Sequence, residues 1–487
     1  MPPRRLTPQQ KEFLDLVSRA AFANPFSEER MHLDLAIAGL PRTATSADRL
    51  AAAVANVSRF LDNLRPWSER PAAVAERDRL DIAHLFVVFH RFVEAFDALI
   101  RKQVEIGSGV CPVPFAGQAL EELAARGFSH AEAVQHFGMF YQLRRAFFFI
   151  QCSLVGRSAC MRQLREALWN NVFTRDVLLY SRHLRGRMDD FSTLLLGETG
   201  TGKGASATAV GRSAYIPYNV KQSAFAESFM GSFIAINLSQ FSESLIESEL
   251  FGHRKGAFTG AVEAHEGVFS RCSRHGAIFL DEIGDVSPPV QIKLLKVLEE
   301  RTFSPVGSHE ARRFEGRIIA ASNCSLDELR GGRRFREDFY YRLCSDVITV
   351  PPLRQRIREE PRELDILVNL ILRRILGYEA PELVDDILDR LHAGVGADYP
   401  WPGNVRELEQ GVRRILLTQA YAGAAGPQDG DLAARVAADI DRGACTAQDL
   451  LNAYCRLLHD RYGTYEEVAR RTRLDRRTVK KYIEESS

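Results

Sequence analysis

A glycine-rich loop with one lysine is the first pattern in the sequence that could do chemistry. The segment GETGTGK at 197–203 directly follows the apolar run 194–196. A strand that leads into such a loop and then into a helix lets backbone N–H groups wrap phosphate oxygens, while the lysine neutralises charge at the β and γ positions. The alternative is an ordinary turn before a helix. The predicted phosphate-binding residues are Gly197, Glu198, Thr199, Gly200, Thr201, Gly202, Lys203 and Gly204.

Two adjacent acids further along the chain could activate water. Asp281 and Glu282 directly follow the apolar run 277–280. At the end of a strand, Asp281 would hold the Mg²⁺ shell and Glu282 would polarise the attacking water. By itself such a pair could be a solvated turn, but its place behind a phosphate loop favours catalysis. The expected chemistry is hydrolysis of the β–γ bond of a nucleoside triphosphate with Mg²⁺, although Gly204 offers no hydroxyl to the metal.

These residues require a parallel α/β sheet to position them. Short apolar runs at 194–196, 277–280 and 318–321 alternate with helical segments and glycine-containing turns, which is typical of that class. From Pro351 to about 421 the pattern becomes helical. An Ala/Gly/Asp-rich stretch then suggests a linker, and a basic helical tail closes the chain.

The first 150 or so residues are predicted to be helical. Apolar residues between Leu85 and Leu99 follow the spacing of one helix with a single apolar stripe, and Gly107 is a plausible stop. Ser129 and Glu132 have the spacing of a capping box. The stripe favours internal packing over a dimerising coiled coil. The aromatic cluster at 137–149 likewise favours a core over a ligand pocket, and no phospho-receiver pattern is found.

Composition bounds the class of protein. The 487 residues carry 64 Lys+Arg against 63 Asp+Glu, and 45% are hydrophobic. A net charge of +1 means that any basic surface must be local. Eight cysteines without a CxxC pair indicate a reducing compartment. The chain offers neither an apolar run long enough to span a membrane nor the apolar core of a secretion signal. We therefore expect a cytoplasmic, multidomain protein with no membrane contact.

The segment GAFTGA at 256–261, embedded after ESELFGH at 247–253, gives the chain a specific resemblance. Together with the nucleotide motifs it resembles the AAA+ domain of bacterial enhancer-binding proteins, the activators of sigma-54 RNA polymerase, from about 155 to 422. A flexible glycine-bounded turn is the alternative. The flanking glycines permit hinge dihedrals, and an exposed Phe is a binding anchor. The resemblance implies sigma-54 contacts at Gly256, Ala257, Phe258, Thr259, Gly260 and Ala261.

The same resemblance assigns further positions. Asn237 matches the asparagine that restrains the catalytic glutamate. Ser322 and Asn323 match the sensor of the γ-phosphate, with Ser where the family usually has Thr. Arg336 and Arg342 match arginine fingers supplied to a neighbouring subunit, although an isolated Arg there would more often form a surface ion pair.

In the helical lid, Arg406 would face the nucleotide and Asn404 could cap a helix. The chain departs from the family pattern at Gly204, where Glu is usual. It also departs in apparent insertions at 172–190 and 216–230.

The basic tail is predicted to bind DNA. Residues 465–471 suggest one short helix, and Asp475 is a suitable N-cap for a second. Ala469 and Val479 have the spacing of a helix-turn-helix crossing, with Arg473 where glycine is often found. A solvated charged helix is the alternative. The predicted DNA contacts are Arg473, Arg476, Arg477, Thr478, Lys480 and Lys481.

Together these patterns predict a multidomain sigma-54-dependent activator. Its central α/β P-loop AAA+ domain with a helical lid would be flanked by an all-α N-terminal domain and a C-terminal helix-turn-helix. The expected bounds are 1–153 for sensing an unknown signal, 154–350 for the ATPase, 351–422 for the lid, 423–445 for a linker and 446–487 for DNA. It would bind upstream enhancer DNA and assemble into a ring, expected to be a hexamer. The alternatives are a DNA-binding regulator or scaffold whose ATPase serves only assembly, and a general ATP-driven remodeller.

Overall fold

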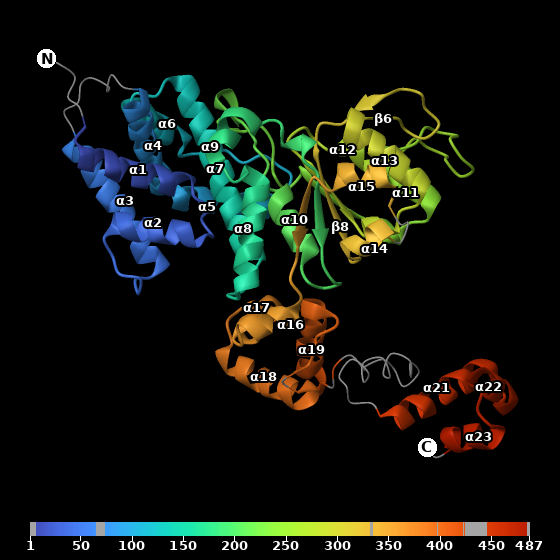
Figure 1. The fold of residues 1–487 in the computed structure, drawn as a ribbon. Helices are drawn as coiled ribbons and strands as arrows, with labels where there is room; N and C mark the ends of the chain where they lie inside the picture. Colours follow the sequence, from blue (N-terminus) through green and yellow to red (C-terminus); the bar gives the residue numbers. More distant parts are fainter. Residues whose placement is uncertain are drawn as a thin grey trace. The chain divides into compact units, whose positions relative to one another are not determined.

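The structure is a computed structural model that describes residues 6–64, 74–331, 335–396, 398–421, 423 and 446–484. The chain forms two compact units (Figure 1). The first comprises Met1–Leu388 with Tyr399–Val412, and the second comprises Asp389–Asp398 with Arg413–Ser487. In the described part of the chain, no helix has the length and apolar character needed to cross a membrane.

A five-stranded parallel sheet forms the centre of the first unit, as the apolar runs predicted. The strand order is β4-β5-β8-β1-β9, and every neighbouring pair is parallel. β1 and β8 are buried along their whole length, which is why they appear in the sequence as continuous apolar runs. The strands are β1 (Thr193–Leu196), β4 (Phe233–Asn237), β5 (Ala277–Asp281), β8 (Arg317–Ser322) and β9 (Asp346–Thr349).

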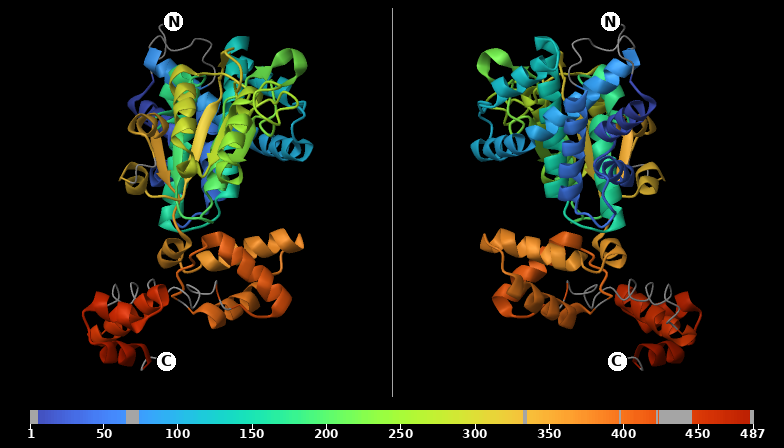
Figure 2. Two further views of the ribbon diagram at one scale, coloured as in Figure 1. Left: turned by 90° about the vertical axis from the view of Figure 1, so that its right-hand side faces the viewer. Right: turned by 90° about the vertical axis from the view of Figure 1, so that its left-hand side faces the viewer.

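Helices cover both faces of this sheet, and Figure 2 shows the two sides in turn. One face packs on α8 and α10, the other on α11, α12, α13 and α15. The α-helices of this region are α8 (Ala159–Phe173), α9 (Val177–Leu179), α10 (Lys203–Gly211), α11 (Glu243–Phe251), α12 (Val268–Arg271), α13 (Pro288–Glu300), α14 (Leu326–Gly331) and α15 (Glu337–Leu343). Two small hairpins pair β2 (Tyr218–Asn219) with β3 (Ala224–Phe225) and β6 (Thr302–Phe303) with β7 (Arg312–Arg313). Single turns are η1 (Tyr180–Leu184), η2 (Met188–Asp190), η3 (Val220–Gln222), η4 (Leu238–Gln240) and η5 (Ile283–Asp285).

Four helices follow β9, in the region where the sequence predicted a helical lid. They are α16 (Leu353–Glu359), α17 (Glu363–Leu376), α18 (Pro381–Val395) and α19 (Asn404–Thr418). Arg356 of α16 and Glu363 of α17 form an ion pair in which both side chains are almost fully buried. Removing one partner of such a pair costs about 3–5 kcal/mol. The pair therefore fixes α16 against α17.

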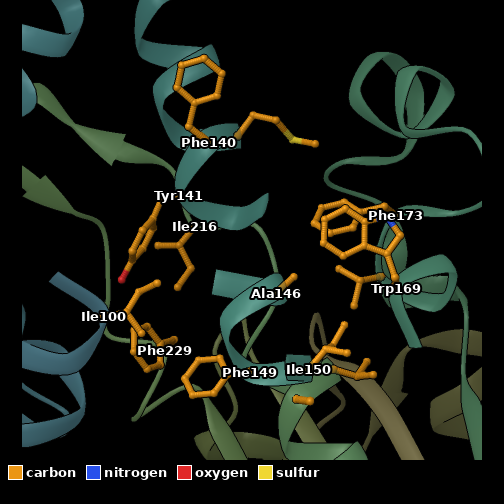
Figure 3. Close-up of a cluster of buried hydrophobic side chains, with 14 of the residues drawn as sticks. Ile100, Phe140, Tyr141, Ala146, Phe149, Ile150, Trp169, Phe173, Ile216 and Phe229 are labelled. Carbon is orange, nitrogen blue, oxygen red and sulfur yellow. The ribbon is translucent and has the colours of Figure 1, made fainter. Parts of the chain in front are cut away.

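The N-terminal region is helical, but it packs as two parts. The helices α1 (Pro8–Phe22), α2 (Glu28–Ala38), α3 (Ser46–Asn63) and α4 (Val74–Arg91) enclose a core of their own. The helices α5 (Val93–Ile106), α6 (Ala116–Ala125) and α7 (His130–Ser153) share one core with α8, α10 and the sheet. Figure 3 shows this shared core, in which Phe149 and Ile150 lie near Trp169 and Phe229. The aromatic cluster is therefore core, which is the favoured of the two interpretations.

The apolar stripe from Leu85 to Leu99 spans two helices, so the prediction of one helix is wrong. The break falls at Phe92, whose φ and ψ are −100° and 7°. α4 packs mostly with α1–α3, whereas α5 packs into the core shared with the sheet, and one straight helix could not serve both cores. The stop at Gly107 and the capping box of Ser129 with Glu132 are confirmed.

Both apparent insertions pack against α7. From the first, the Tyr180 hydroxyl accepts a hydrogen bond of 2.6 Å from Gln142 Nε2, which also donates to the Ser213 carbonyl. From the second, the Phe225 ring stacks on Tyr141 with centroids 3.8 Å apart. Because α7 also packs against α10, the insertions and α7 together cover the helix that follows the phosphate loop.

The second unit ends in three helices, α21 (Ala447–Tyr462), α22 (Tyr465–Thr472) and α23 (Arg476–Glu484). Cys455, Val468 and Val479 form their buried centre. Arg473 has a φ of 55°, so it takes the left-handed position at the end of α22 that glycine often fills. The Asp475 side chain accepts from the Arg477 N–H, which bears out its expected capping role.

Candidate nucleotide site and surface loop

A cavity of about 340 Å³ lies where β1, β4 and β5 end. Its lining joins the predicted phosphate loop to residues from several other segments of the first unit. The predicted site residues that line it are Thr199, Gly200, Thr201, Gly202, Lys203, Gly204, Asn237, Asp281, Glu282 and Arg406. Ligand sites at the carboxyl ends of parallel strands are the rule in open α/β sheets.

The loop after β1 has the backbone that its glycines permit. Gly200 and Gly202 have φ values of 80° and 109°, and α10 begins at Lys203. A Cβ at Gly200 would stand 2.2 Å from the Gly403 carbonyl oxygen, so the close approach of loop and lid also demands glycine. By contrast, a Cβ at Gly204 would meet only Phe279, at 3.9 Å. The space around residue 204 would therefore accept a side chain.

Lys203 and the two acids share one electrostatic environment. The Lys203 ammonium donates to the carbonyls of Gly197 and Glu198 at 2.7 and 3.1 Å. Burial lowers the Lys203 pKa, while Glu282 and Asp281 act in the opposite sense. Burial raises the pKa of Glu282, against the lowering effect of Lys203. A carboxylate with a raised pKa in a cavity is a suitable general base.

Asn237 and Asp281 are neighbours because β4 and β5 pair in register. Both line the cavity together with Glu282. The Asn237 amide oxygen accepts from the Ser239 N–H at 3.0 Å and from the Ser239 hydroxyl at 2.8 Å. In this structure the amide oxygen therefore bonds within its own turn.

The lid is hydrogen-bonded to the phosphate loop. Asn404 donates to the Glu198 carboxylate and to the Thr199 carbonyl, each at 3.1 Å, and accepts from the Leu353 N–H at 2.8 Å. Glu198 also accepts from Arg354 at 2.7 Å, a bond that lowers the Glu198 pKa. Asn404 was expected to cap α19, but its side-chain oxygen bonds to Leu353 instead. Its contacts place the neighbouring Arg406 at the cavity.

A buried carboxylate that sequence analysis missed holds the apolar wall of the cavity. Glu363 accepts from the Arg157 N–H and from Arg356 Nε, each at 2.8 Å, and Arg356 donates to the Val155 carbonyl. A Cβ at Gly156 would stand 2.1 Å from Glu363 Oε1, so glycine is required there. No local sequence pattern predicts the hydrogen bonds of Glu363, because this residue lies about two hundred residues from its main-chain partner Arg157.

The predicted sensor residues lie beside the cavity. Ser322 ends β8 and is fully buried, and its hydroxyl accepts from the Cys324 N–H at 3.1 Å. Its carbonyl accepts from the Gly197 N–H at 3.3 Å. Asn323 is exposed, and its backbone N–H contributes to lowering the Glu282 pKa.

The two predicted arginine fingers do not line the cavity of their own chain. Arg336 is exposed and forms an ion pair of 2.8 Å with Asp338. Arg342 is half-buried, and its Nε donates to the Leu298 carbonyl at 3.0 Å.

The segment 256–261 forms a surface loop with a fixed base. Gly256 and Gly260 have φ values of 80° and 101°, and the Gly256 N–H donates to the Ala261 carbonyl at 2.8 Å. His253 exchanges two backbone hydrogen bonds with His265, which closes the base. The Phe258 ring is 36% exposed and lies 4.9 Å from the His253 ring. Thr259 is exposed beside it.

Basic side chains gather on the last two helices. Arg473, Arg476 and Arg477 are exposed, and Arg476 pairs with Glu466 at 2.9 Å. Lys480 and Lys481 are also exposed, while Thr478 is half-buried.

The fold and the site define an α/β domain of the P-loop class with a helical lid. Residues 175–349 match the family described as the sigma-54 interaction domain, an AAA+ ATPase family. Residues 175–349 therefore form a sigma-54 interaction domain, the domain that characterises the bacterial enhancer-binding proteins, the sigma-54-dependent activators. The resemblance stated from the motifs is thereby confirmed.

Similar curated proteins have names that agree with this family. The hydrogenase transcriptional regulatory protein HoxA of Cupriavidus necator is 42% identical over 231 residues, or 47% of this chain and 43% of HoxA. The sigma-54-dependent transcriptional activator SfnR of Pseudomonas putida is 40% identical over 47% of this chain and 57% of SfnR. The regulatory protein AtoC of Escherichia coli is 38% identical over 53% of each chain. The chain thus spans about half the length of the curated relatives it matches.

Proposed function

We propose that this protein is an ATP-driven activator of transcription by sigma-54 RNA polymerase. ATP with Mg²⁺ would occupy the cavity, with Lys203 at the phosphates and Asp281 toward the metal. Glu282 would accept a proton from the attacking water, and Arg336 and Arg342 would reach the cavity of a neighbouring subunit in a ring, which we expect to be a hexamer. An activator that works on polymerase and DNA would act in the cytoplasm.

The observation that carries this proposal is the connection between the cavity and the loop at 256–261. Asn237 lines the cavity at the end of β4, and α11 follows within a few residues and leads directly into the loop. A second connection runs from Asp281 and Glu282 to α13, which begins at Pro288 a few residues later. Lys293 of α13 forms an ion pair of 2.7 Å with Glu247 of α11. Rearrangement at the cleaved phosphate would move α11 and, with it, Phe258 and Thr259 against the sigma factor.

DNA would be bound by the last two helices. The exposed basic residues Arg473, Arg476, Arg477, Lys480 and Lys481, with Thr478, would contact phosphates and bases from α23 and the turn before it. The N-terminal helices would receive a signal and control the ATPase.

A single substitution tests the central step. Thr259→Ala lies outside the cavity and should leave the ATPase rate within about twofold, while ATP-dependent open-complex formation at a sigma-54 promoter falls by more than about tenfold. Ser308→Ala, which removes a hydroxyl in a neighbouring surface loop, is the matched control. Full promoter opening by Thr259→Ala would count against the proposed role of the loop. ATPase activity in the wild type without any promoter opening would favour a regulator whose ATPase serves only assembly.

A further inference from the structure

A second cavity, of about 510 Å³, lies on the far side of α10 from the sheet. Its walls come from α5, α7, α10 with its C-cap, and α17, all within the first unit. We call it the basic pocket and define it by Arg101, Phe148, Phe149, Arg212 and Arg374. Its volume falls in the range of small-molecule sites.

The charges of the basic pocket favour an anion. Three guanidinium groups, those of Arg101, Arg212 and Arg374, face one carboxylate, that of Glu105. Within the described residues, neither Arg212 nor Arg374 has an acidic partner at ion-pair distance, and Arg101 lies 4.0 Å from Asp97. Guanidinium groups present paired N–H donors that match the oxygens of a carboxylate or phosphate.

The surroundings of Arg212 give the strongest support for an anion in the basic pocket. It is half-buried at the end of α10, and its guanidinium lies 5.6 Å from the centroid of the Phe149 ring. Its Nε is shielded from solvent and has no hydrogen-bond partner in the described part of the chain. A shielded cation with an unmet donor costs free energy. An anion beside the outer guanidinium nitrogens of Arg212 would offset part of that cost by compensating the charge.

The pocket also offers a surface for a ring. The Phe148 ring lines it, with the Arg101 guanidinium 5.9 Å from the ring centroid, and the Val104 side chain beside it is 40% exposed. Aromatic and aliphatic groups next to guanidinium planes suit a flat ring, which can stack on both.

We propose that the basic pocket binds a small anion built on a flat aromatic ring, such as an aromatic carboxylate or phosphate. The ring lies against Phe148 and Val104, and the anionic group bonds to Arg212 and Arg374. This site goes beyond the proposed function, since it is separate from the residues assigned to ATP hydrolysis, to the sigma factor and to DNA.

The occupant of the basic pocket would influence the nucleotide site. Ser153, Ala205 and Arg374 line both cavities. A ligand that draws the Arg374 side chain into the basic pocket removes it from the nucleotide cavity. By thermodynamic linkage, each ligand then changes the affinity of the other by the same factor.

The test is calorimetric titration of the full-length protein saturated with ADP. The probe is 1-naphthyl phosphate, with inorganic phosphate as the anion-only arm and 1-naphthol as the ring-only arm. We expect one naphthyl phosphate per chain, bound at least about tenfold more tightly than either partial probe. Arg212→Gln should weaken it by about tenfold, and Phe148→Leu should weaken it while leaving inorganic phosphate unaffected.

Matched variants keep the outcome interpretable. Arg59→Gln, an exposed arginine of α3, should bind like the wild type. Arg101→Gln, at an exposed position, should weaken the binding of naphthyl phosphate. Equal affinity for all three probes, loss of binding in simple competition with ADP, or unchanged affinity in Arg212→Gln and Arg101→Gln would each overturn the proposal. Because no ATP turnover is measured, the result is independent of the function proposed above.

Discussion

At the scale of single residues, Glu282 combines an unusual backbone with a perturbed side chain. Its φ of 55° places it in the left-handed region, immediately after the last residue of β5. Non-glycine residues rarely adopt this conformation, and they concentrate at functional sites. The turn directs its carboxylate to the same cavity as Lys203, whose charge opposes the effect of burial on the Glu282 pKa.

Glu282→Gln should abolish turnover and leave nucleotide binding largely intact. The amide has the same shape but cannot accept a proton from water, so the ATPase rate should fall by at least about 100-fold. ATP affinity, measured by calorimetry, should stay within about threefold because Lys203 and the loop amides are unchanged. Glu299→Gln, an exposed position on α13, is the control. Hydrolysis retained by Glu282→Gln would refute the assignment of the base.

His90 links stability to pH. Burial lowers its pKa from 6.5 to about 3, and its Nδ1 lies 2.8 Å from the Phe86 carbonyl oxygen, to which the neutral ring donates. The folded chain therefore binds fewer protons than the unfolded chain between these values. The contribution of His90 to stability is full above pH 6.5 and is lost as the pH falls toward 3.

The free energy of unfolding should therefore fall by about 1 kcal/mol between pH 6.5 and 5.5 because of His90. Denaturant titrations at the two pH values would measure this. His90→Gln should reduce this fall by about 1 kcal/mol, whereas His130→Gln, at an exposed site on α7, should leave it unchanged. Equal pH slopes in the wild type and His90→Gln would show that other groups cause the effect.

At the scale of elements, Asn404 is one of the side chains that join the lid to the phosphate loop, together with Arg354. Asn404 joins the loop, through Glu198 and Thr199, to the start of α16 at Leu353. Asn404 also has a φ of 53°, which asparagine and glycine tolerate better than alanine. Hydrogen bonding and backbone strain can therefore be separated by choosing the substitution.

Asn404→Gly tolerates the positive φ and removes the hydrogen bonds of the side chain, while Asn404→Ala removes the same bonds and adds backbone strain. We expect Asn404→Gly to bind ADP about tenfold more weakly, because Arg406 is no longer held at the cavity. Asn404→Ala should lose similar affinity and about 1 kcal/mol more stability. Calorimetry and denaturant unfolding measure the two quantities. Wild-type ADP affinity in Asn404→Gly would contradict a positioning role.

Sequence patterns anticipate the elements that are locally encoded. Apolar runs of a few residues predict the strands that bear Asp281 and Ser322. Closely spaced glycines predict the loop before Lys203, and the spacing of Ser129 from Glu132 predicts the helix cap. The pairing of Glu198 with Asn404 joins positions about two hundred residues apart, so no local pattern carries it. The break at Phe92 also escaped prediction, because the apolar period continues through it while the two helices pack into different cores.

At the scale of the whole molecule, the N-terminal helices α5–α7 share a hydrophobic core with the sheet domain. α7 packs with α8 and α10 in one apolar cluster that reaches the sheet through Phe279 and Ile319. The first insertion adds Tyr180 to the same cluster, and the second adds Tyr218, Phe225 and Phe229. α1–α4, in contrast, enclose a separate core. A signal received near α7 would therefore act on the helix that follows the phosphate loop without an intervening linker.

Two truncations should separate these parts. A chain beginning at Phe92 loses α1–α4 but keeps the shared core except for Val88 and the α1–α4 side chains at its edge, so it should unfold cooperatively on heating and bind ADP within about threefold of the wild type. A chain beginning at Leu154 also loses α5–α7 and exposes the partners of Phe137, Tyr141 and Phe149. Each buried aromatic contributes about 2–3 kcal/mol, so the sum approaches the whole stability of a domain. This shorter chain should aggregate or show no cooperative transition by calorimetry. A Leu154 chain as stable as the Phe92 chain would mean that α7 is only a detachable regulator.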